Sequence, residues 1–231
     1  MQVRGNFVYL LASLLGFLAF LAIITEYPQL GGWRLISIAF EVSLIVAIWS
    51  LVRKRTWFVV GMVLIVIGAM GVVAHFWTQA LWTNVISLMV SFCFYLMTTL
   101  IAFQELFRPS PIDLNKIMGS VCIYLLAGLN WALLYYFEEL LHPGAFAGLD
   151  TSSVEEMMFN LIYYSYVTLS TLGYGDITPL APIAKVLAVL EALFGQFYIA
   201  ILVAIIVGIH VSLRKKALSG GSGSGAKGEK P

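Results

Sequence analysis

Charged residues are scarce in this chain. Only 11% of its 231 residues are Asp, Glu, Lys or Arg, whereas 61% are hydrophobic and the mean hydropathy is +0.94. Because soluble domains carry about 25% charged residues, this composition excludes an ordinary soluble protein and indicates a membrane protein. The net charge is only +1, which argues against a nucleic-acid partner.

Cysteine is almost absent as well. Cys93 and Cys122 are the only two, and both fall within apolar runs. We therefore expect packing residues rather than a disulfide or a cysteine metal site.

Long apolar runs are what the chain has in abundance. A helix needs about 20 apolar residues to cross the hydrocarbon core of a bilayer. A shorter run, 157–170, feeds directly into a glycine motif and predicts a helix that enters the membrane and returns. The expected fold is an all-α membrane protein with six transmembrane helices, a re-entrant helix and a following loop, the six spans being 7–25, 35–52, 57–75, 81–103, 117–137 and 183–213.

The basic residues predict the orientation of these spans. With both termini cytoplasmic, every Lys and Arg except Arg34 and Lys185 lies on the inner side, as expected for short cytoplasmic loops. We expect a multi-pass protein of the cell membrane. A signal peptide is the alternative for the first span, although its apolar core exceeds the usual length of about 7–15 residues.

The chain divides into a front half and a back half. Residues 1–103 form four spans, 104–116 a cytoplasmic linker broken by two prolines, and 117–213 an outer helix, re-entrant helix, loop and inner helix. Residues 214–231 are expected to be a tail, first basic and then rich in Gly and Ser, that is flexible.

The loop motif Thr171-Leu172-Gly173-Tyr174-Gly175-Asp176 carries the chemistry. A cation leaves water only when other oxygens replace its hydration shell, and successive backbone carbonyls can do so. Gly173 and Gly175 tolerate positive φ, which allows successive peptides to turn their oxygens towards one axis. Tyr174 is then expected to point away and pack against the short helix, while Asp176 places a carboxylate at the outer mouth.

This motif resembles the signature of the tetrameric potassium channels, whose filter sequence TVGYG is an established example. The resemblance covers the back half, and Leu172 stands where Val is commoner. It implies a homotetramer in membrane lipid that passes potassium ions without chemistry or an organic cofactor. The ion sites it implies are the carbonyls of Thr171, Leu172, Gly173, Tyr174 and Gly175, with the Thr171 hydroxyl.

Other interpretations of the motif remain open. An ordinary turn explains the glycines but not their order after a half-length helix. A nucleotide-binding loop needs a third glycine and a βαβ setting, and this sequence has neither. Related transporters join four pore repeats in one chain, and one repeat is present here. A non-conducting or regulatory subunit, or a weakly selective cation channel, is the alternative function.

The inner helix carries further candidates. Gly195 matches the family's hinge glycine, with close helix packing as the alternative. Glu191 is an acid within a span and is expected to support the filter from behind. Helical spacing places on one stripe, as cavity and gate residues, Gln196, Ile199, Val203 and Val207.

The front half lacks a voltage sensor. No Lys or Arg occurs from Thr56 to Leu106, which includes the third and fourth spans. Sensor helices need several such charges. We therefore expect the front half to serve packing, lipid contact or regulation.

Overall fold

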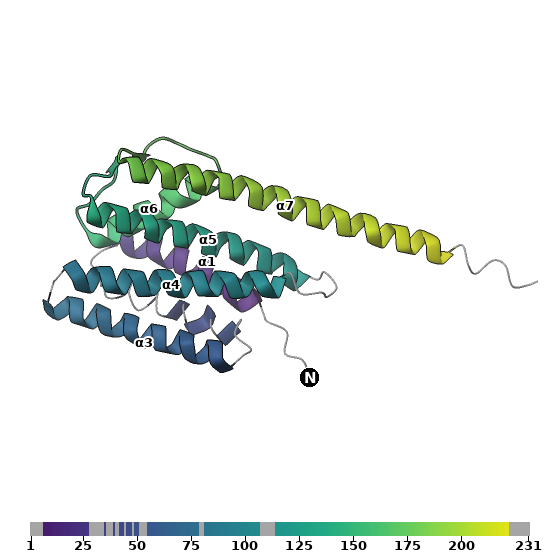
Figure 1. The fold of residues 1–231 in the computed structure, drawn as a ribbon, viewed down its shortest axis with the longest axis horizontal. Helices are drawn as coiled ribbons and strands as arrows, with labels where there is room; N and C mark the ends of the chain where they lie inside the picture. Colours follow the sequence, from purple (N-terminus) through teal and green to yellow (C-terminus); the bar gives the residue numbers. More distant parts are fainter. Residues whose placement is uncertain are drawn as a thin grey trace, which may run out of the picture.

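Helices make up almost all of the computed structural model, which describes residues 7–27, 35, 39, 42–43, 45–47, 49–50, 55–78, 81–106 and 114–221. For 204–221 it describes the helix and not the side chains. The long elements, shown in Figure 1, are α1 (Phe7–Glu26), α3 (Arg55–Thr78), α4 (Leu81–Leu106), α5 (Leu114–Leu141), α6 (Val154–Leu169) and α7 (Pro182–Gly221).

The helices follow the apolar runs of the sequence. α1 and α4 begin at the predicted residues, and α5 extends a few residues beyond the predicted span at each end. Among the described residues, four helical segments are long and apolar enough to cross a membrane: Phe7–Glu26, Trp82–Leu106, Leu114–Leu141 and Pro182–Val203. The all-helical membrane class is thus confirmed. Six spans remain a prediction, because half of 35–52 lies outside the described residues and α3 is not among the four segments.

α7 is longer than the sequence predicted. It continues eight residues past the expected end at Leu213, so the first part of the predicted flexible tail is helical. The reason is local, since Arg214, Lys215 and Lys216 are good helix formers and no proline follows before Gly221. Figure 1 shows α7 running well beyond the other helices.

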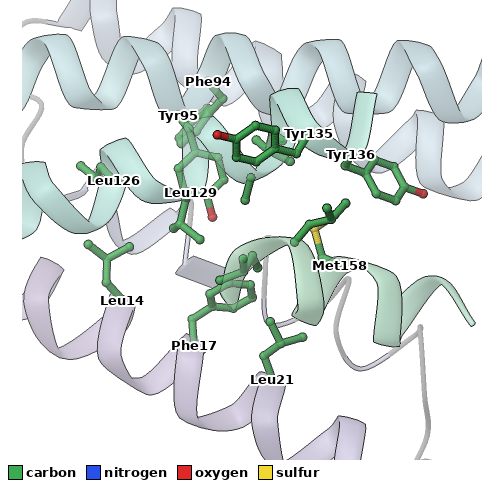
Figure 2. Packing of buried hydrophobic residues seen from close by; sticks show 14 of the residues in the cluster. Leu14, Phe17, Leu21, Phe94, Tyr95, Leu126, Leu129, Tyr135, Tyr136 and Met158 are labelled. Atoms are coloured by element: carbon green, nitrogen blue, oxygen red, sulfur yellow. The ribbon is translucent and has the colours of Figure 1, made fainter. Parts of the chain in front are cut away.

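The first helix packs against the back half of the chain. α1 contacts both α5 and α6, and its buried side chains recur every three to four residues along one face. Figure 2 shows Leu14, Phe17 and Leu21 pointing towards Leu129 of α5 and Met158 of α6. The core is therefore continuous across the predicted boundary at residue 103.

The start of α1 is fixed by α5. The Phe7 amide, one of the amides that have no partner within the helix, donates to Asn115 Oδ1 at 2.9 Å. Two turns further into α5, the Cys122 thiol lies 3.6 Å from the Phe7 carbonyl oxygen. Cys122 is buried and unpaired, as expected of a packing residue.

Candidate functional site

The short helix α6 precedes the glycine motif. Its 16 residues span roughly 24 Å, which is less than the hydrocarbon thickness. Its N-cap is Ser153, whose hydroxyl accepts a hydrogen bond from the Glu156 amide at 3.1 Å. The helix ends at Leu169, immediately before the motif.

The motif itself alternates in backbone handedness. Gly173 and Gly175 have φ of 58° and 80°, and Thr171 has φ of 59°. Leu172 and Tyr174, between them, do not have positive φ. This alternation allows successive carbonyls to turn to the same side. The sequence did not predict positive φ at Thr171, which is costly for a β-branched residue.

Hydrogen bonds attach the start of Thr171–Asp176, the segment called the strand below although it pairs in no sheet among the described residues, to the end of α6. The amides of Leu172 and Gly173 both donate to the Val167 carbonyl, at 2.9 and 3.3 Å, and the Thr171 amide donates to Thr168 at 2.9 Å. The position of the strand therefore depends directly on the position of the last turn of α6.

The residues that follow the motif are held by a small sheet that sequence reasoning missed. β1 (Phe146–Ala147) pairs antiparallel with β2 (Thr178–Pro179). The Leu180 amide also donates to the Ala145 carbonyl at 2.8 Å. Gly148, with φ of 76°, permits close approach, because a Cβ there would overlap the carbonyl oxygen of Asp176. Strands of two residues carry no periodic pattern that could have indicated them.

Two side chains of the motif meet Tyr163 of α6. The Tyr174 ring stacks on the Tyr163 ring, with centroids 6.5 Å apart and planes 10° from parallel, so Tyr174 packs against the short helix as expected. A hydrogen bond with the Tyr163 hydroxyl lowers the pKa of the exposed Asp176 carboxyl, and it raises the pKa of the Tyr163 phenol. Asp176 is therefore ionised at neutral pH and places a negative charge at the C-terminal end of the motif.

The strand lies on the surface of the single chain. All six motif residues are exposed, and the relative solvent-accessible areas of Leu172 and Tyr174 are 55% and 66%. Behind them an apolar cavity of about 420 Å³ lies between α1, α6 and the strand. Large apolar groups exposed together in this way mark a surface that contacts another protein or lipid.

Glu191 lies behind α6, where the sequence predicted support for the strand. It is fully buried. Its two carboxyl oxygens contact the Tyr135 hydroxyl of α5 and the Ser165 hydroxyl of α6, the latter at 2.5 Å. The carboxyl group thus joins α5, α6 and α7. Sequence reasoning did not identify Tyr135 or Ser165, because it could not place one helix face against another.

The remaining inner-helix candidates lie along α7. Gln196 Nε2 lies 3.5 Å from Thr171 Oγ1, which brings these two predicted site residues together. Ile199 and Val203 are exposed on the single chain, and the Val207 side chain lies outside the described residues. Their roles in a cavity or gate stay predictions.

Gly195 is in close contact with the end of α6. A Cβ at this position would overlap the backbone carbonyl oxygen of Leu169. This contact supports the close-packing alternative for Gly195, and the hinge stays a prediction.

We expect Gly195→Ala to lower the free energy of unfolding by about 1–3 kcal/mol, as overpacking does in well-packed cores. Gly16→Ala is the matched control, since Gly16 is an exposed helical glycine with nothing within 4 Å of an added Cβ. Thermal unfolding of both variants in detergent measures the difference. Equal melting temperatures would show that α7 and α6 separate without cost.

Comparison with known proteins addresses the same part of the chain. A family model described as "Ion channel" matches residues 121–211, which comprise most of α5, all of α6 and the motif, and α7 to Val211. This part of the chain is similar to ion channels. The match points to a channel rather than an enzyme, and it covers less than half of the chain.

Two plant proteins are similar to the chain. "Two-pore potassium channel 5" of Arabidopsis thaliana is 30% identical over 114 residues, which are 48% of this chain and 25% of the relative. "Two pore potassium channel c" of Oryza sativa subsp. japonica is 31% identical over 96 residues, 42% and 20% of the two chains. The chain thus spans a quarter or less of each relative's length. No solved structure matches it.

Proposed function

We propose that this protein is a subunit of a channel that passes potassium ions passively across the cell membrane, with both termini cytoplasmic. The observation that carries the proposal is the strand Thr171–Asp176, in which alternate residues have positive φ directly after a half-length helix. The similarity of residues 121–211 to ion channels supports it, as do the names of the two plant relatives.

In the proposed mechanism the backbone replaces water. Carbonyl oxygens of Thr171 to Gly175 coordinate the dehydrated ion, and the Thr171 hydroxyl adds a ligand at the inner end. The carbonyl end of α6 carries the negative end of the helix dipole and favours a cation nearby. Asp176 concentrates cations at the mouth. No bond is made or broken, and the potassium ion is the cargo rather than a cofactor.

We further propose that four copies assemble around one axis in membrane lipid. One strand cannot surround an ion, and a closed symmetric ring supplies the missing ligands. The exposure of Leu172 and Tyr174 on the single chain supports this assembly, because contact with a neighbouring copy would cover them. Mass measurement in mild detergent should give four chains per particle, whereas a conducting monomer or dimer would contradict the arrangement.

The decisive test of the function is ion selectivity. Purified protein in a planar bilayer, with potassium on one side and sodium on the other, should give a reversal potential that strongly favours potassium. Equal permeability would reduce the proposal to a weakly selective cation channel. Absence of current from a folded tetramer would favour the alternative, a non-conducting or regulatory subunit.

A further inference from the structure

Glu191 is buried among neutral groups. It is fully inaccessible, and its two carboxyl oxygens contact Tyr135 and Ser165. The other titratable groups that face it are Tyr124 of α5 and Tyr164 and Tyr166 of α6. In the described part of the chain, no Lys, Arg or His forms an ion pair with Glu191. Burying an ionised carboxylate without a cationic partner is costly, which favours the neutral acid.

The number of hydrogen atoms available for the contacts of this cluster also favours the neutral acid. Ser165 Oγ lies 2.5 Å from Glu191 Oε1 and 2.7 Å from the Gly128 carbonyl oxygen. The serine hydroxyl carries one hydrogen, so an ionised carboxylate would leave one of these two short oxygen–oxygen contacts without any hydrogen. If Glu191 is protonated on Oε1, it donates to Ser165, Ser165 donates to Gly128, and Tyr135 donates to Oε2. Each contact then has one hydrogen.

We propose that Glu191 is a protonated acid in the folded protein and that its hydrogen-bond donation to Ser165 positions the last turns of α6. Two further contacts hold α6 against its neighbouring helices. The Tyr166 hydroxyl donates to the Leu125 carbonyl of α5 at 2.8 Å, on the turn next to Gly128. One turn along α7 from Glu191, Gly195 lies against the Leu169 carbonyl. α6 is thus held between α5 and α7 just before the residue that anchors the strand.

This inference deepens the proposed function, because the strand anchored by the Val167 carbonyl is the proposed ion-coordinating strand. Glu191 is a positioning residue in this scheme. It does not reach the ion, and it acts through Ser165 and α6.

Infrared difference spectroscopy tests the protonation state. The spectrum of the purified wild type minus that of Glu191→Gln, both at neutral pH, should contain the carbonyl stretch of a protonated carboxyl group. Glu26→Gln is the matched control, since Glu26 is an exposed glutamate at the end of α1 and should instead remove a carboxylate band. Loss of a carboxylate band, and no protonated band, in Glu191→Gln would overturn the proposal.

Hydrogen–deuterium exchange tests the positioning role. Glutamine keeps one donor and one acceptor on the same skeleton, so Glu191→Gln should retain the protection of backbone amides 165–173. Glu191→Met fills a similar volume without either group and should lose that protection while the remote helices α3 and α4 keep theirs. Wild-type protection in the methionine variant, or its loss in the glutamine variant, would overturn the positioning role. Neither measurement needs ion flux, so failure here is distinguishable from failure of the proposed function.

Discussion

Replacing Gly173 by alanine is expected to abolish potassium conduction or its selectivity. The φ of Gly173 is 58°, where a residue with a Cβ is disfavoured by about 1–2 kcal/mol. Nothing lies within 4 Å of the added Cβ, so the effect is on the backbone and not a steric clash with a neighbour. When the backbone relaxes to negative φ, the carbonyl turns away from the axis and the ion loses a ligand. Reversal potentials and single-channel currents in a bilayer measure the result.

A second glycine provides the control for this prediction. Gly144 has φ of 85° and open space around it, but it lies in the loop after α5 and outside the motif. Gly144→Ala introduces comparable backbone strain and should leave conduction and selectivity as in the wild type. Equal behaviour of the two variants, both conducting selectively, would exclude Gly173 from the ion pathway.

Open probability is expected to vary only weakly with membrane voltage. Moving one charge through 100 mV yields about 2.3 kcal/mol, and steep gating therefore needs several charges in each subunit. α3 after its first residue, Arg55, and all of α4 contain no Lys or Arg. The sequence cluster Arg53, Lys54 and Arg55 precedes the predicted third span, where we expect it to serve as a cytoplasmic topology anchor rather than a sensor.

Single-channel recording between about −100 and +100 mV, a range over which sensor charges would contribute several kcal/mol each, tests this expectation. Gly173→Ala is the control: currents that the wild type shows and this variant does not are assigned to the protein rather than to a contaminant. A steep sigmoidal opening curve with measurable gating current would show that charge elsewhere in the chain senses the field.

Sequence patterning predicted the helices better than their contacts. Spans such as 81–103 were predictable because the solvent requires a long apolar run, and the cap at Ser153 because its spacing to Glu156 is local. The partners of Glu191 were not, since Ser165 and Tyr135 meet it only after three helices pack. Polar residues within apolar helices were the available signal, and they indicated that partners exist without indicating which ones.

Composition gave the wrong end for the last helix. The predicted tail was assigned as flexible from its Gly and Ser content, whereas the basic residues at its start are good helix formers and α7 continues through them to Gly221. At the motif, glycine marked two of the three positions with positive φ, and Thr171 gave no such signal because its conformation is imposed by the turn at the end of α6.

The contact between α1 and α5 has a consequence for biosynthesis. The Phe7 amide and its acceptor Asn115 are 108 residues apart in the chain. At translation rates of about 5–20 residues per second, α5 leaves the ribosome some 5–20 seconds after α1. During that interval the first helix is already in the bilayer, and its face of Leu10, Leu14, Phe17 and Leu21 has only lipid or another nascent segment to contact. α1 is therefore synthesised well before its native neighbours α5 and α6 are available to pack against it.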